Sequence, residues 1–172
     1  MGQAKKISRL ITALVLVIAL VVLLLIIFIR MSSPLDEISK ELGIKLPAAA
    51  RILSGDDNHG GFHGDGRAWY EIDTAGASFD PPPKGWHSLP LCGDARAAFC
   101  GGTTTLGGGR ADILPAVPDG AVLPEVTNGC WFFLDRQGRE GSVFDESRFS
   151  VNFTAALYDA DTGRLYYLKA DS

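Results

Sequence analysis

The chain has 172 residues, with 16 basic and 20 acidic side chains and a net charge of −4 at pH 7. The first 30 residues hold four basic and no acidic side chains, so residues 31–172 carry a net charge of −8. Nucleic-acid binding needs clustered Lys and Arg, so this balance argues against a nucleic-acid partner, and it also opposes docking on anionic lipid head groups. Residues 31–172 suffice for one domain with its own core.

Leu10–Ile29 forms an apolar run of 20 residues, in which Thr12 is the only polar one. A helix rises about 1.5 Å per residue, so a run of this length matches a hydrocarbon core of roughly 30 Å. Secretory signals have apolar regions of about 7–15 residues and end at an Ala-x-Ala-like site, which is absent here. The run predicts an uncleaved transmembrane anchor that spans the lipid bilayer at residues 10–29. A cleaved signal is the alternative.

Basic residues around the run predict its orientation. Lys5, Lys6 and Arg9 precede it together with the terminal amine, and Arg30 follows it. The positive-inside rule therefore favours a cytoplasmic N-terminus and an external C-terminal part. We expect a single-pass protein of the cell membrane, in which residues 1–30 form a cytoplasmic stub and the anchor.

A short helix is predicted directly after the anchor. Ser33 suits the N-cap position and Pro34 the first helical position, while Gly43 suits the end of the helix. Apolar residues between them recur at helical spacing. We assign residues 31–46 to a short amphipathic helix, either a spacer or the first element of the domain, and residues 47–172 to the domain itself.

The next part of the chain predicts strands separated by loops. Ala50–Ser54 and Ala68–Ile72 have the composition of strands and flank a glycine-rich stretch. Residues 74–91 contain a triple proline and are expected to be mostly loop. Residues 101–130 are rich in glycine and proline, which predicts irregular backbone with short strands.

The C-terminal part predicts a β-hairpin. Gly129–Asp135 is a short apolar run that suits a buried strand. Phe149–Tyr158 alternates apolar and polar residues, which predicts a strand with one buried face. A turn ending at Gly163 leads into a second strand at Arg164–Ala170. The expected fold class is α+β: one N-terminal transmembrane helix, then a small domain built on a mainly antiparallel β-sheet with a C-terminal β-hairpin.

Three cysteines follow the anchor, namely Cys92, Cys100 and Cys130. Their odd number and the absence of a CxxC pair favour three small buried apolar residues. A Cys92–Cys100 disulfide is the alternative if the domain lies outside the cell.

The segment Asp56–Gly66 (DDNHGGFHGDG) gathers two of the three histidines with three aspartates. We take His59, His63, Asp65 and Asp57 as candidate residues for binding a ligand or an ion. The glycines argue against a helix, and a straight strand would place the two histidines roughly 13 Å apart, but a tight loop could bring them together. The alternative is a hairpin in which His and Asp make local hydrogen bonds. The pattern identifies no metal, cofactor or catalytic residue.

Other signatures of chemistry are weak in this chain. The Asp159–Gly163 segment lacks most ligands of a calcium loop, so we interpret it as a turn. The glycine runs lack the order of a phosphate-binding loop, and no G-x-S-x-G sequence is present.

Four segments of the chain are similar to segments of a known family: HGGFHGDG (59–66), GWHSLPL (85–91), GCWFFLDR (129–136) and FSVNFTAALYDADTGRLYYLKAD (149–171). With them the chain resembles an uncharacterised family of small, membrane-anchored or secreted proteins from Gram-positive bacteria, over most of residues 34–172. The resemblance supplies no activity and no catalytic residues. In that family a histidine often follows the "DR" step, where this chain has Gln137.

Three hypotheses about function follow. In the first, the protein displays an acidic domain outside the cell that binds a protein or a small ligand. The alternative is a membrane-tethered, metal-dependent hydrolase that uses His59, His63 and Asp65. The third is a subunit of a larger membrane assembly, which the lack of a small-xxx-small pattern in the span does not support.

Overall fold

The chain forms two compact units, Met1–Glu37 and Ile38–Ser172. The computed structural model describes Thr12 and residues 14–23, 33–60, 64–106, 109–113, 115–117, 123–145 and 148–172. In the first unit, Thr12 and residues 14–23 are helical, which covers part of the predicted span. No helix within the described residues is long and apolar enough to cross a membrane. The anchor at Leu10–Ile29 stays a prediction.

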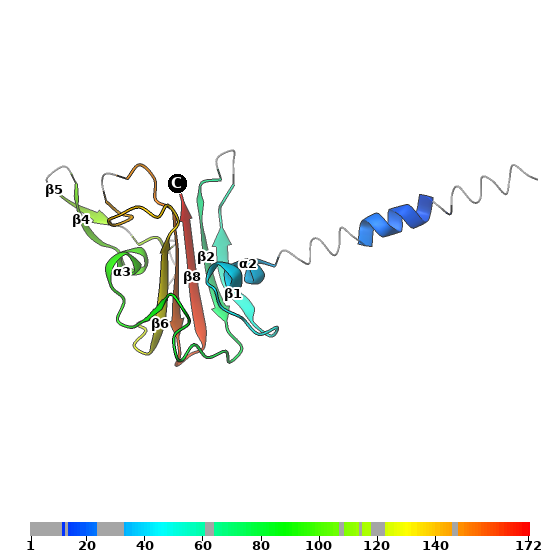
Figure 1. Ribbon diagram of the computed structural model, residues 1–172, viewed down its shortest axis with the longest axis horizontal. Helices are drawn as coiled ribbons and strands as arrows, with labels where there is room; N and C mark the ends of the chain where they lie inside the picture. The colour runs from blue at the N-terminus through cyan, green and yellow to red at the C-terminus, as the bar shows by residue number, and fades with distance from the viewer. Residues whose placement is uncertain are drawn as a thin grey trace, which may run out of the picture. The chain divides into compact units, whose positions relative to one another are not determined.

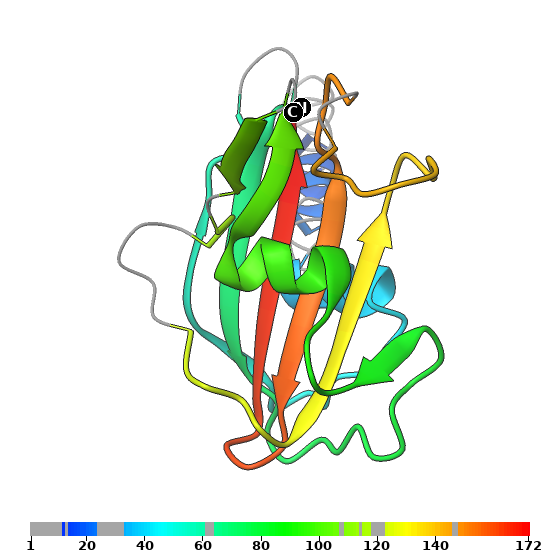
Figure 2. The same ribbon diagram turned by 90° about the vertical axis from the view of Figure 1, so that its left-hand side faces the viewer.

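The second unit is built on a six-stranded antiparallel sheet with the strand order β1-β2-β8-β7-β6-β3 (Figures 1 and 2). A two-stranded sheet, β4-β5, accompanies it. The elements are α2 (Pro34–Glu41), β1 (Arg51–Asp57), β2 (Gly66–Asp73), β3 (Trp86–Ser88), α3 (Gly93–Cys100), β4 (Gly102–Leu106), β5 (Gly109–Ile113), β6 (Gly129–Asp135), β7 (Phe153–Asp159) and β8 (Arg164–Asp171). With the N-terminal segment, the described residues contain three helices. The α+β class with a mainly antiparallel sheet is confirmed.

The C-terminal hairpin is formed by β7 and β8, which pair from Phe153↔Ala170 to Asp159↔Arg164. Gly163 has a φ of 65°, the conformation that a glycine adopts at little cost in a turn. The first strand begins at Phe153, four residues later than the sequence predicts. Phe149 is fully exposed, so its predicted place on a buried face is wrong.

Both faces of the central strands are covered. On one face Phe153, Ala155 and Leu157 belong to the core cluster that includes Ala98 and Phe99 of α3. Figure 2 shows α3 lying across this face. The other face packs against the C-terminal end of α2, where Ile38 is buried, as is Leu42 just beyond it. Every residue of β7 is consequently buried, and the prediction of a single buried face is wrong.

The remaining elements agree with the sequence predictions to different degrees. β6 has the predicted bounds Gly129–Asp135, and β1 continues to Asp57, three residues beyond its predicted end. β3 lies within the predicted loop 74–91. α3 was not predicted, because no side chain caps its start and its buried face consists of two alanines and one phenylalanine.

All three cysteines are free thiols. Cys130 is buried on β6, but Cys92 and Cys100 are exposed, so the prediction of three buried cysteines is wrong for these two. Cys92 is the N-cap of α3 and Cys100 is its last residue. A helix of eight residues holds them at opposite ends, which explains why the alternative disulfide is not formed.

Candidate functional site

The glycine–histidine segment follows β1 and leads into β2. Beyond the strand pairing, Asn58 extends the ladder: its N–H donates to the carbonyl of Arg67 at 3.0 Å, and its Oδ1 accepts from the N–H of Arg67 at 2.6 Å. Gly66 allows the close approach of the two strands, because a Cβ there would lie 2.6 Å from Cα of His59. The backbone of His59 is thereby held against the start of β2.

His59 lies between two carboxylates. Its Nδ1 is 2.7 Å from Oδ1 of Asp57, and its Nε2 is 3.1 Å from Oδ2 of Asp171, at the end of β8. The N–H of His59 also donates to Oδ1 of Asp57 at 3.0 Å. The side chain is only 20% exposed. A protonated ring donates at both nitrogens, so this form satisfies both carboxylates.

Asp171 also connects the histidine to an arginine. Its Oδ1 is 2.6 Å from Nη2 of Arg136, in the turn after β6. The same guanidinium donates to the carbonyls of Ala170 at 2.6 Å and Phe153 at 3.2 Å. We call His59, Asp57, Asp171 and Arg136 the histidine clasp, since these four residues join the β1–β2 connection to the ends of β7 and β8.

The clasp also affects the ionisation of Asp57. Burial by itself raises the pKa of this carboxyl, but the backbone N–H, the ring and the charge of His59 hold the pKa below its ordinary value. The hydroxyl of Tyr70 contributes in the same direction, at 3.4 Å from Oδ2 of Asp57. Asp57 is therefore ionised when the clasp is formed.

The clasp brings together only part of the predicted site. Asp57 and His59 contact each other, whereas Asp65 is exposed and makes no hydrogen bond or ion pair with another described residue. His63 lies outside the described residues. Asp171 and Arg136 were missed by sequence reasoning, because 112 residues separate His59 from Asp171 and no local pattern links them.

A metal-binding role finds no support in the described part of the chain. No group of three His, Cys, Asp or Glu side chains in that part is arranged to hold an ion. A ligating imidazole must also present a free ring lone pair, whereas both ring nitrogens of His59 face carboxylate oxygens. In this arrangement His59 is a structural residue.

A second charged cluster joins the end of α2 to β8. Nζ of Lys169 is 2.8 Å from Oε1 of Glu41, and the Tyr167 hydroxyl donates to Oε2 of the same carboxylate. Burial raises the pKa of Glu41, but the hydrogen bonds and charge of its partners outweigh it, so the pKa lies below its ordinary value. Burial and the bond to Glu41 raise the pKa of Tyr167. The cluster holds the last turn of α2 on the sheet.

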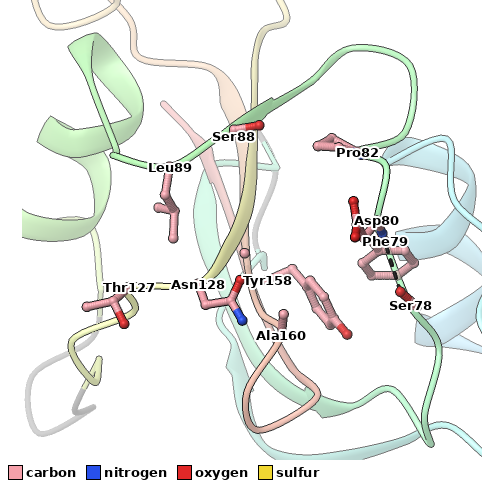
Figure 3. Close-up of a pocket in the computed structure, with 11 residues that line it drawn as sticks. Ser78, Phe79, Asp80, Pro82, Ser88, Leu89, Thr127, Asn128, Tyr158 and Ala160 are labelled. Carbon is pink, nitrogen blue, oxygen red and sulfur yellow. Dashed lines mark hydrogen bonds between the residues drawn. The ribbon is translucent and has the colours of Figure 1, made fainter.

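A pocket of about 470 Å³ lies at the edge of the sheet formed by β3 and β6 (Figure 3). We call it the Asp80 pocket. Its lining residues come from four separate parts of the chain, the last of which is the end of β7 with the start of the turn after it: Ser78, Phe79, Asp80, Pro82, Ser88, Leu89, Thr127, Asn128, Gly129, Tyr158 and Ala160. Figure 3 shows Asp80 on one side and Asn128 on the other, with Tyr158 between them. Sequence reasoning missed this pocket, because its segments meet only in the folded sheet.

Polar contacts hold the walls of the Asp80 pocket in place. The Tyr158 hydroxyl donates to the carbonyl of Ala77 at 2.8 Å, which fixes the ring beside the segment 78–82. Nδ2 of Asn128 donates to Oδ1 of Asp161 at 2.7 Å, and the N–H of Ala160 donates to the carbonyl of Asn128 at 2.9 Å. These bonds attach the opposite wall to the β7–β8 turn.

A further shallow concavity contains His87, Cys92 and Trp131. The ring of His87 stacks on the indole of Trp131 with centroids 4.5 Å apart and an interplanar angle of 28°. His87, which has no partner recognisable in the sequence, thus has an aromatic partner on the neighbouring strand. This contact is a cross-strand pair between β3 and β6.

Comparisons with known proteins add no relative. No family model matches the chain, and neither a curated protein nor a solved structure matches it. The resemblance to the Gram-positive family stays a prediction.

Proposed function

We propose that the chain is a single-pass membrane protein whose domain lies outside the cell and binds a small ligand in the Asp80 pocket. The observation that carries the proposal is the pocket itself. Its volume of about 470 Å³ falls within the range of roughly 300–1,000 Å³ that is typical of small-molecule sites. Like such sites, it combines apolar side chains with a few convergent polar groups.

Binding is better supported than the alternative of a metal-dependent hydrolase. That alternative requires His59 to offer a nitrogen to an ion or a proton to a substrate. Both ring nitrogens already face the carboxylates of Asp57 and Asp171, at 2.7 and 3.1 Å. Among the described residues, this contact pattern favours a binding function over the hydrolase.

The membrane part of the proposal rests on the apolar run at residues 10–29 and the basic residues before it. Protease treatment of intact cells tests the orientation. We expect the domain to be degraded before lysis while the N-terminus survives. A domain that stays intact until the cells are lysed would overturn the external location.

Ligand binding is tested with a pocket-filling variant. Ser88 lies on the edge strand β3 and lines the pocket, and Ser54 is a matched exposed serine on the opposite edge strand β1. The detergent-solubilised full chain is screened against a library of small molecules by thermal shift. The same screen is then repeated with the variants Ser88→Trp and Ser54→Trp. We expect ligands that stabilise the wild type and Ser54→Trp but not Ser88→Trp. Equal responses of both variants, or no ligand at all, would contradict the proposal.

A further inference from the structure

The Asp80 pocket carries a negative charge without a cationic partner. Among the described residues that line it, none is Lys, Arg or His. Asp135 and Asp171 form ion pairs with arginines, whereas Asp80 forms none with the described residues. The charge of Asp80 also acts on the buried Cys130 of β6: burial and the Asp80 carboxylate raise the pKa of the Cys130 thiol to about 11. A bound cation would supply the missing partner.

The other polar side chains of the pocket are hydroxyls and an amide, all of which can accept a hydrogen bond. Nδ2 of Asn128 uses one of its two N–H bonds on Asp161, so the amide offers a ligand Oδ1 as an acceptor and one remaining N–H. The Tyr158 hydroxyl uses its proton on the carbonyl of Ala77. An ammonium group donates three hydrogen bonds and accepts none, so it matches the Asp80 carboxylate and the oxygen atoms beside it, while a carboxylate ligand would meet the negative charge of Asp80 with no cation in the lining.

Aromatic rings complete the complementarity. Phe79 and Tyr158 both line the pocket, and their rings pack edge to face with centroids 4.6 Å apart. Tyr158 lies between Asp80 and Asn128 in Figure 3. The two side chains are only 8% and 5% exposed, so they offer a small apolar surface to the body of a ligand.

We infer that the ligand of the Asp80 pocket is a small organic cation, with an ammonium group that pairs with Asp80 and an apolar body that lies against Phe79 and Tyr158. This inference rests on the proposed function, because it names the ligand class of the same pocket.

Three probes of matched size and different charge test the inference: 2-phenylethylammonium, 2-phenylethanol and 3-phenylpropanoate. Binding to the detergent-solubilised full chain is followed by chemical-shift changes, which also show whether a probe lies at Asn128 and Tyr158. The variant Asp80→Asn removes the charge. Asp56→Asn is the matched control, since Asp56 is an exposed aspartate on β1, at the opposite edge of the sheet.

We expect the ammonium to bind the pocket most tightly of the three probes. Its affinity should fall about tenfold in Asp80→Asn and stay unchanged in Asp56→Asn. Raising the salt concentration should weaken the binding of the ammonium and leave the binding of the alcohol unchanged. If the alcohol or the carboxylate binds the pocket as well as the ammonium, the pocket is a binding site but the inferred charge selection is wrong. If none of the three shifts a pocket residue, the cation inference fails. The library screen with Ser88→Trp then decides the proposed function separately.

Discussion

Nε2 of His59 lies 3.1 Å from Oδ2 of Asp171, although 112 residues separate them in the sequence. The sheet order explains the contact, because β2 lies beside β8 and Gly66 pairs with Asp171. The first hairpin of the domain is therefore joined to its last strand by a partly buried hydrogen bond.

Replacing Asp171 tests the contribution of the histidine clasp. Asp171→Asn removes the negative charge that Nε2 of His59 and Nη2 of Arg136 both contact. We expect the free energy of unfolding to fall by about 1–3 kcal/mol, as for hydrogen bonds to charged groups. Urea denaturation of the full chain measures it. Asp65→Asn is the control, because Asp65 is exposed, and a loss equal to that of Asp171→Asn would refute the clasp.

The close approach at Gly66 gives a second prediction. In Gly66→Ala the new Cβ would meet Cα and N of His59 at 2.6 and 2.7 Å, and the backbone cannot yield as a flexible side chain would. We expect a loss of about 1–3 kcal/mol, typical of overpacking, and a displaced His59 ring. Gly60→Ala belongs to the same segment and meets nothing closer than 3.8 Å, so it should change stability by less than about 0.5 kcal/mol. Denaturation curves of the two variants provide the comparison.

Glu41 makes stability depend on pH in a defined direction. Its pKa in the folded protein lies below the ordinary value of 4.5, despite the opposing effect of burial. Its contribution is therefore fully present above pH 4.5 and is lost as the pH falls through the folded pKa. We expect Glu41→Gln to be less stable than the wild type at pH 7, with a difference that shrinks in acid. Unfolding free energies between pH 7 and pH 3 measure this, and a difference independent of pH would contradict the role of the charge.

The cysteines should react at different rates with thiol reagents. Cys92 and Cys100 are exposed, whereas Cys130 is buried and its pKa is raised to about 11. Because the thiolate is the reactive form, we expect two labels on the native chain at pH 8 and the third only after unfolding. Mass spectrometry of peptides identifies the labelled positions. Rapid native labelling of Cys130 would mean that β6 is more accessible than the structure indicates.

Local patterns predicted the elements that carry strong local signals. The strand Gly129–Asp135 and the hairpin around Gly163 agree with the structure, because an apolar run and a tight turn are properties of adjacent residues. The sequence did not predict α3, because its small side chains give no strong helical periodicity and no side chain caps its start. Of the clasp residues, sequence reasoning singled out Asp57 and His59, which are close in sequence, but not Asp171 and Arg136, which are distant from them.

The sequence by itself determined the charge difference between the first 30 residues and the rest, the apolar run at 10–29 and the antiparallel character of the C-terminal hairpin. Only the tertiary structure decided that β7 is buried on both faces and that His59 is held between two carboxylates. It alone also showed the Asp80 pocket, whose walls come from separate segments. The physical reason is the same for all three. Periodicity and turn chemistry act between neighbouring residues, whereas burial, ion pairs and pockets depend on which strands lie side by side.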